Sequence, residues 1–411
     1  MLAGLAAASM EQSERSSEIS MQELAALVET AGGQAVGMMI QNRPTPDPRS
    51  FIGDGKVAEL KEFIEMNDCD LAVFDNELSP SQMRVLGEEL GVKVLDRSGL
   101  ILDIFAQRAQ TREGQLQVEL AQYKYLLPRL TGMWTHLVRQ TASGGSSPIG
   151  TRGPGETQLE TDRRHIRRKI QKLEEELAAV RKVRSTQRRK REKNDVPVVA
   201  LVGYTNAGKS TLLNCLTDAG IPANDRLFDT LDTTTRKLRI DEVTEVLISD
   251  TVGFIRKLPH HLVEAFKATL EELQYADLLI HVIDASDPER EAHMQVVERL
   301  IGELAKPGVP VIDFYNKCDI AENGAPRGEN NVEISARTGE GIDALKALAE
   351  RLLERGLHHV RLCLPYSMGG MVDTLHSQAR VLSCRYEAEG ILVEAIMDET
   401  LYGRLLPYVT E

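Results

Sequence analysis

Residues Gly203 to Ser210 read G-Y-T-N-A-G-K-S and fit the phosphate-loop pattern G-x-x-x-x-G-K-[ST]. The stretch before them, 196–202, is apolar and rich in β-branched residues, which is typical of a buried strand. The glycines let successive backbone N–H groups turn toward phosphate oxygens. Lys209 is expected to reach the β- and γ-phosphates, and Ser210 to give its hydroxyl to Mg²⁺. A helix starting at Thr211 would direct its positive end at the same phosphates. The stretch therefore predicts a nucleotide site.

Three further motifs follow expected strands, at the carboxyl ends where ligands bind in an open parallel sheet. The first of them, Asp250-Thr251-Val252-Gly253, places a carboxylate near Mg²⁺ and a glycine N–H at the γ-phosphate. The other two are Asn316-Lys317-Cys318-Asp319 and Ser335-Ala336-Arg337.

The motif at 316–319 indicates which base is bound. The Asp319 carboxylate can accept two hydrogen bonds from the N1–H and N2–H₂ edge of guanine, and adenine has no such pair of donors. Adenine would leave the carboxylate unpaired, at a cost of about 1–3 kcal/mol or more. Backbone N–H groups of Ser335 and Ala336 would close over the same edge. Four motifs in this order predict a GTPase domain; a metabolic kinase with the same loop is disfavoured because it has no use for Asp319.

Phe254 stands where a Ras-like GTPase carries the glutamine that orients the attacking water. An apolar ring cannot position water. Hydrolysis then needs a backbone group, a bound cation or a group from a partner, so we expect a slow intrinsic rate that can be stimulated.

Composition points to a multidomain globular protein. The 411 residues are 42% hydrophobic and 27% charged, and they contain no apolar run long enough to span a membrane. The first residues lack the basic region of a signal peptide. The five cysteines are scattered, which favours reduced thiols over disulfides or zinc. We expect a cytoplasmic protein, with peripheral membrane association as an alternative.

The fold class expected from the element pattern is α/β, in four parts after a flexible tail over 1–20. Strands alternating with helices predict a small parallel α/β domain over 21–112. Two heptad-spaced helices predict an antiparallel hairpin arm over 113–196 with a Gly-rich tip at 139–155. The nucleotide domain, a doubly wound sheet, should cover 197–356, and a small α+β domain 357–411. Within the arm, Pro128 should kink or end the first helix, and Thr157 should begin a capping box for the second.

The arm carries an unusual charge. The formal net charge of the chain is −13, which by itself argues against a nucleic-acid partner. Residues 163–193, however, hold 14 Lys or Arg against 4 Glu, and the tip adds Arg139 and Arg152 without an acid. A solvated helix face is the ordinary interpretation. Because like charges four residues apart repel one another, the density favours an arm that binds a polyanion.

These motifs resemble the HflX branch of the translation-associated GTPases. The resemblance rests on the phosphate loop, on F-D-T-L-D-T-T-T-R at 228–236, on D-T-V-G-F at 250–254 and on G-T-R-G-P-G-E-T-Q-L-E-T-D-R-R at 150–164. It covers about residues 30 to 355 and is weaker in the final unit.

The resemblance implies a first switch at 228–232, with Ser210 and Thr230 as Mg²⁺ ligands, although Thr233, Thr234 and Thr235 are rival switch threonines. Lys209, Thr230 and Gly253 would be the catalytic residues, with GTP/GDP and Mg²⁺ as cofactors. The expected nucleotide contacts are Gly203, Tyr204, Thr205, Asn206, Ala207, Gly208, Lys209, Ser210, Phe228, Asp229, Thr230, Leu231, Asp232, Asp250, Thr251, Val252, Gly253, Asn316, Lys317, Cys318, Asp319, Ser335, Ala336 and Arg337.

The resemblance also implies a partner. The family binds the large ribosomal subunit, and members split ribosomes in a GTP-dependent way, often under stress. We therefore expect a monomer whose arm contacts the large subunit and its RNA. The alternative is an RNA-binding assembly factor in which hydrolysis only times release.

Overall fold

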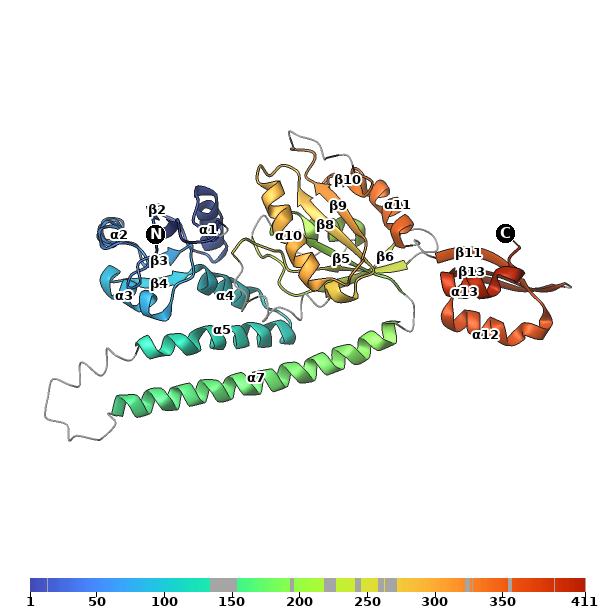
Figure 1. Ribbon diagram of the computed structural model, residues 1–411, viewed down its shortest axis with the longest axis horizontal. Coiled ribbons are helices and arrows are strands. Elements are labelled where there is room, and N and C mark those ends of the chain that lie inside the picture. The colour runs from blue at the N-terminus through green and yellow to red at the C-terminus, as the bar shows by residue number, and fades with distance from the viewer. Residues whose placement is uncertain are drawn as a thin grey trace.

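The computed structural model describes residues 1–411 except 13, 134–153, 193–195, 218–226, 241–244, 258–261, 263–271, 322–325, 327, 354–356, 388 and 411. Figure 1 shows the N-terminal domain beside the nucleotide domain, the arm running along both, and the C-terminal unit at the far end of the molecule. The predicted Gly-rich tip lies outside the described residues except at its end, where the second arm helix begins.

The N-terminal domain is a parallel four-stranded sheet with helices on both faces. The strand order is β2-β1-β3-β4. One apolar cluster joins the sheet to α1 and α4, and a second joins it to α2 and α3. The elements are β1 (Leu2–Ala7), α1 (Glu18–Thr30), β2 (Met38–Arg43), α2 (Asp54–Met66), β3 (Leu71–Phe74), α3 (Pro80–Leu90), β4 (Lys93–Asp96) and α4 (Arg97–Arg108).

The prediction of a flexible tail over 1–20 is wrong. Strand β1 pairs with both β2 and β3, so it lies inside the sheet, and Leu2 and Leu5 are buried. Helix α1 already begins at Glu18, with Ser17 and Ser20 in a capping box. The strand escaped detection because L-A-G-L-A-A is buried on both faces. It therefore shows no alternation, and it contains no β-branched residue.

The arm consists of α5 (Arg112–Met133) and α7 (Pro154–Glu192). The two predicted apolar seams meet in one cluster built on Leu116, Leu120, Leu173 and Leu177. Arg112 and Glu176 form an ion pair between the helices, with 2.7 Å between N and O. At 1.5 Å per residue, α7 is about 58 Å long.

The predicted cap at Thr157 is wrong, and of the two alternatives predicted for Pro128 the structure excludes an end of the helix. Helix α5 continues through Pro128 because tertiary bonds hold the turns around it. The hydroxyl of Tyr125 donates to Asp96 at 2.7 Å, and the guanidinium of Arg129 donates to the same carboxylate at 3.0 Å. Helix α7 begins at Pro154, a residue suited to a first helical position, so Thr157 lies inside the helix and does not cap it.

The nucleotide domain has a six-stranded sheet in the order β10-β9-β8-β5-β7-β6, parallel except for the antiparallel edge strand β6. Helix α10 packs on one face, and α8 and α11 pack on the other. The elements are β5 (Val198–Gly203), α8 (Lys209–Thr217), β6 (Thr234–Arg239), β7 (Glu245–Asp250), β8 (Leu278–Asp284), α10 (Arg290–Leu304), β9 (Val311–Asn316), β10 (Asn331–Glu333) and α11 (Ile342–Leu353).

The C-terminal unit has the predicted β-α-β-β-α order. Its antiparallel sheet has the strand order β11-β13-β12, and both helices pack against the sheet in one apolar core. The elements are β11 (Leu357–Leu364), a 3₁₀ turn (Tyr366–Met368), α12 (Gly369–Gln378), β12 (Arg380–Glu387), β13 (Gly390–Asp398), α13 (Glu399–Leu405) and a second 3₁₀ turn (Leu406–Tyr408). Among the described residues, no helix is long and apolar enough to cross a membrane.

The N-terminal and nucleotide domains share an apolar cluster. Phe105 of α4 meets Phe228 edge to face, with 4.8 Å between the ring centroids. Leu231 and Phe254 belong to the same cluster and are almost fully buried. The first switch therefore packs between the two domains.

Candidate nucleotide site

The phosphate loop connects the end of β5 to the start of α8. Gly208 has a φ of +96°, and a Cβ at this position would lie 2.1 Å from the amide nitrogen of Asn316, so only glycine fits. The ammonium of Lys209 folds back over the loop and donates to the carbonyl oxygens of Gly203 (3.2 Å) and Tyr204 (2.8 Å). Burial lowers the pKa of Lys209 to about 8, although the charge of Asp250 opposes the shift.

Three oxygen-bearing side chains converge beside the loop. The hydroxyl of Ser210 lies 2.7 Å from the hydroxyl of Thr230 and donates to Asp250 Oδ2 at 2.7 Å. Asp250 Oδ1 is buried without a hydrogen-bond partner in the described structure. Burial raises the pKa of Asp250, and the charge of Lys209 and the bond from Ser210 oppose this. Two hydroxyls and a carboxylate oxygen that lacks a partner form a donor set suited to Mg²⁺.

The structure separates Thr230 from its three rivals. Thr234 and Thr235 are part of β6, where the Thr235 hydroxyl meets that of Ser249 at 2.9 Å. Thr233 Oγ1 instead lies 3.4 Å from Arg184 of the arm. Of these four threonines, the described contacts bring only Thr230 to Ser210.

The base motifs are tied to the phosphate loop through Asn316. Its side-chain amide donates to the carbonyl of Ala207 at 2.8 Å and accepts from the backbone N–H of Ala336 at 2.9 Å. Lys317 pairs with Asp284 at 2.6 Å, and Asp319 is exposed at the end of the loop. The 316–319 and 335–337 motifs, far apart in sequence, thus share one edge of the sheet.

A pocket lies between the phosphate loop and the first switch. Most of the predicted contacts in these segments line it, together with Thr211: Thr205, Asn206, Gly208, Lys209, Ser210, Phe228, Asp229, Thr230 and Gly253.

Several predicted contacts point elsewhere. Leu231 and Val252 are buried in the apolar cluster, and the Thr251 hydroxyl donates to the carbonyl of Leu201 at 2.6 Å. The side chains of Tyr204 and Asp232 reach the N-terminal domain and the arm. Tyr204 lies in the phosphate loop and Asp232 in the first switch, and both were therefore predicted to contact the nucleotide. Their side chains instead bind residues outside the nucleotide domain.

The backbone of Phe254 is hydrogen-bonded to the phosphate loop. Its N–H donates to the carbonyl of Gly203 at 3.1 Å, and its carbonyl accepts from the N–H of Thr205 at 2.8 Å. The ring is 1% exposed and belongs to the cluster shared with the N-terminal domain. The ring is therefore a packing group. We call residues 250–257 the second switch.

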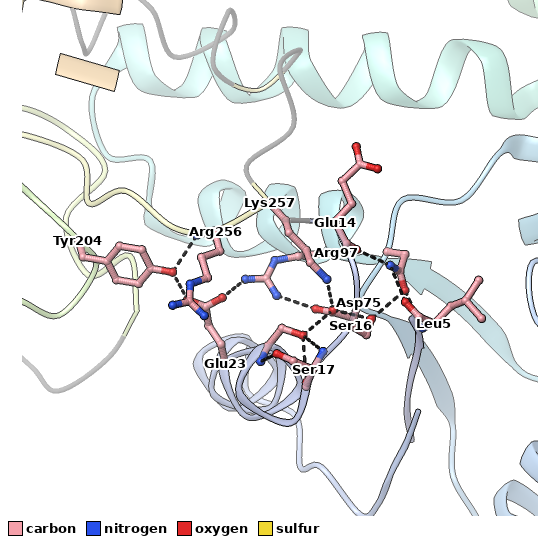
Figure 2. Close-up of polar contacts among 12 residues, drawn as sticks. Leu5, Glu14, Ser16, Ser17, Glu23, Asp75, Arg97, Tyr204, Arg256 and Lys257 are labelled. Atoms are coloured by element: carbon pink, nitrogen blue, oxygen red, sulfur yellow. Dashed lines mark hydrogen bonds and ion pairs between the residues drawn. The ribbon is translucent and has the colours of Figure 1, made fainter. Parts of the chain in front are cut away.

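A buried ionic network fastens the nucleotide domain to the N-terminal domain (Figure 2). Arg97 donates to Asp75 at 2.8 Å and pairs with Glu23, while Lys257 of the second switch also pairs with Asp75. Tyr204 donates its hydroxyl hydrogen to Glu23 and accepts from the backbone N–H of Arg256 at 2.8 Å. The network thus reaches both the phosphate loop and the second switch.

Charge compensation holds this network together. Burial raises the pKa of Asp75, but the charges of Arg97 and Lys257 outweigh burial and leave it below its ordinary value. Burial lowers the pKa of Lys257, and Asp75 opposes the shift. Burial and the neighbouring Glu23 raise the pKa of Tyr204, which keeps it a neutral donor. Sequence reasoning assigned Tyr204 to the nucleotide and missed its partners in this network, because no local pattern relates positions so far apart.

Comparison with known proteins agrees with this geometry. Residues 198–317 match the family described as "50S ribosome-binding GTPase", residues 18–106 match "GTP-binding GTPase N-terminal", and residues 108–191 match "GTP-binding GTPase Middle Region". A phosphate loop, a hydroxyl–carboxylate cluster and an Asn-Lys-x-Asp base motif on a doubly wound sheet define a P-loop GTPase, an enzyme that binds and hydrolyses GTP.

Sequence similarity to known GTPases identifies the family within this class. The chain is 47% identical over 393 residues to GTPase HflX of Caldanaerobacter subterraneus, covering 95% of this chain and 90% of the relative. It is 48% identical over 351 residues to GTPase HflX of Escherichia coli K12, covering 83% and 81%. The chain belongs to the HflX family of GTPases, which confirms the resemblance. A solved structure of a GTP-binding protein from Sulfolobus solfataricus in complex with GDP is 24% identical, with a TM-score of 0.44, and covers 86% of this chain and 99% of that one.

Proposed function

We propose that this GTPase holds GTP between the phosphate loop and the 316–319 motif and uses it to act on the large ribosomal subunit. The convergence of Ser210, Thr230 and Asp250 beside Lys209 carries the first half of the proposal. Ser210 and Thr230 would hold Mg²⁺ directly, with Asp250 bonded to Ser210. The bound ion would neutralise charge on the β- and γ-phosphate oxygens.

The remaining site residues bind and orient the nucleotide. Lys209 exchanges two carbonyl oxygens for phosphate oxygens when it moves off the loop backbone. Gly253 offers its N–H to the γ-phosphate. The exposed carboxylate of Asp319 accepts the guanine N1–H and N2–H₂. Because the Phe254 ring is buried in the core, it cannot orient the attacking water. A backbone group, a bound cation or a group from a partner must do so, and we expect a slow intrinsic rate that the ribosome stimulates.

The arm is the part suited to ribosomal RNA. Its described basic residues on α7 include Arg164, Arg167, Arg168, Lys172 and Arg181, all exposed. An exposed row of cations on a long helix contacts phosphates and releases counterions when it binds. A ribosome-bound role also places the protein in the cytoplasm, in keeping with its five free cysteines.

The decisive experiment separates splitting from timed release. Ribosomes are sedimented with the protein and either GDP or a non-hydrolysable GTP analogue. Splitting predicts free subunits with the analogue and not with GDP. If the protein stays bound with the analogue but the ribosomes remain whole, it is an assembly or release factor; if it never sediments with ribosomes, the proposal fails.

A charge variant tests the arm in the same assay. Replacing Arg167 and Arg168 by Gln should weaken ribosome binding and lower the slope of log K against log salt by about one unit for each phosphate that the variant no longer binds. Arg299→Gln, at an exposed position of α10, is the control and should leave the slope unchanged. Equal slopes for the wild type and both variants would show that α7 does not contact phosphates.

A further inference from the structure

The side chain of Asp232, the last residue of the first switch, leaves the nucleotide site and binds the start of the arm. Its Oδ2 accepts the backbone N–H groups of Gln110 and Thr111, both at 2.8 Å. Its Oδ1 accepts the hydroxyl of Thr111 at 2.5 Å, and that hydroxyl accepts the N–H of Gly114 at 3.0 Å. Because the first N–H groups of a helix have no partner within it, Asp232 and Thr111 together cap α5.

The arm is fitted to receive this carboxylate. Gly114 lies in the first turn of α5, and a Cβ at this position would stand 2.3 Å from Asp232 Oδ1. Any other residue at 114 would push the carboxylate away. The contact therefore depends both on the Asp232 carboxylate and on the absence of a side chain at Gly114.

The second arm helix reaches the same point. The guanidinium of Arg184 on α7 pairs with Glu113 of α5 at 3.2 Å and with Glu272 of the nucleotide domain at 2.7 Å. It also lies 3.4 Å from the hydroxyl of Thr233. Asp229, within the first switch, pairs with Arg108 at the end of α4 at 3.5 Å. The first switch is thus held by α4 and by the residues that lead into α5, and α7 contacts Thr233 directly after it.

We propose that Asp232 is a positioning residue that couples the first switch to the arm. Thr230 and Asp232 are two residues apart, and two residues of chain span about 7 Å at most. The backbone that brings Thr230 to Ser210 therefore also brings Asp232 to α5. When the first switch leaves the nucleotide, Gln110 and Thr111 lose the carboxylate that holds them, and the start of α5 is released from the nucleotide domain. This coupling rests on the proposed nucleotide site.

Coupling of this kind is reciprocal. If GTP favours the capped arm, the capped arm favours GTP over GDP by the same factor. Removal of the Asp232 carboxylate should therefore lower affinity for GTP and leave affinity for GDP nearly unchanged. A residue with a purely structural role would not alter the ratio of the two affinities.

The test measures amide hydrogen exchange over residues 108–120 and both nucleotide affinities in the full-length protein. With a non-hydrolysable GTP analogue, the wild-type amides of Gln110, Thr111 and Gly114 should exchange at least about tenfold more slowly than with GDP. Asp232→Asn and Gly114→Ala should remove that difference and reduce the affinity ratio by about tenfold, within the usual range of coupling. Asp54→Asn, at the exposed start of α2, is the matched control and should retain both.

The results separate the coupling from the site itself. Equal exchange with both nucleotides in the wild type overturns the coupling, as does an equal loss of GTP and GDP affinity in Asp232→Asn. An effect in only one of the two variants also overturns it, because both act on the same contact. Failure of the nucleotide site would look different: Lys209→Ala would then bind both nucleotides as tightly as the wild type.

Discussion

Removing the Arg97 guanidinium should loosen the N-terminal domain and its attachment to the nucleotide domain. Arg97 is 2% exposed and lies between two carboxylates, those of Asp75 and Glu23, which are 0% and 12% exposed. Arg97→Met keeps the stem of the side chain and removes the charge. Asp75 then retains only Lys257 as a cationic partner, and Glu23 retains only the hydroxyl of Tyr204 among the contacts described for this network.

The size of the effect follows from burial. Breaking a buried ion pair by removing one partner costs about 3–5 kcal/mol, since the other charge stays desolvated. Each factor of ten in an opening equilibrium corresponds to about 1.4 kcal/mol. Exchange of the Val73 amide, which donates to the carbonyl of Met1 at 2.9 Å, should therefore accelerate by more than about a hundredfold.

Arg84→Met is the matched control in the same domain. Arg84 pairs with Glu88 at 3.0 Å, but both side chains are more than a third exposed. An exposed pair contributes about 0–1 kcal/mol, so exchange of the Val73 amide should change by less than about fivefold. Equal acceleration in the two variants would refute the argument that burial makes the Arg97 network strong.

The effect of Arg97→Met should depend on pH. The pKa of folded Asp75 lies below its ordinary value of 3.8, because Arg97 and Lys257 outweigh burial. A depressed carboxyl pKa contributes stability that is fully present above pH 3.8 and is lost as pH falls through the folded value. The exchange ratio of variant to wild type should therefore be constant from about pH 5 to 8 and shrink below about pH 4. A ratio that grows on acidification would contradict this sign.

Three further predictions concern the nucleotide site. Lys209→Ala should abolish tight GTP binding in a fluorescent-nucleotide titration, because it removes the cation at the phosphates; unchanged affinity would contradict the assignment. Asp319→Asn should weaken guanine binding and improve xanthine binding, since the amide can donate to the oxygen at C2; retained GTP affinity would show that Asp319 does not contact the base. Phe254→Ala should destabilise the protein by about 3–5 kcal/mol and Phe254→Leu by about 1.5 or less, measured by urea denaturation, and equal costs would mean that the ring is not a packing group.

Motifs confined to short stretches were predictable because the chemistry depends on neighbouring residues. The phosphate loop, Asp250 and Asn316 all stand at strand ends, where the order of the motifs alone brings them together. The pairing of the two arm helices was also predictable, since their apolar residues repeat at heptad spacing and meet in one cluster.

Contacts between distant segments were not predictable. Asp232 and Thr111 are separated by 121 positions, and nothing in either neighbourhood indicates that they meet. The same holds for Tyr204 and Glu23, 181 positions apart.

Helix α4 was not predicted from the sequence, for another reason. It follows β4 without a loop, with Asp96 both ending the strand and capping the helix, and most of its residues are buried, so no amphipathic period is visible.

The single, unbroken course of α7 makes it a lever. Its anchor at Arg184 and its beginning at Pro154 are thirty residues apart, which is about 45 Å along a helix. A rotation of about 5° around the anchor would carry the Pro154 end through about 4 Å, more than the diameter of a water molecule. A shift at the base that is too small to disturb the packing of the nucleotide domain is thus enlarged at the far end. The length of α7 alone therefore converts a small rotation at Arg184 into a displacement of several ångströms at Pro154, which is large enough to move a bound partner.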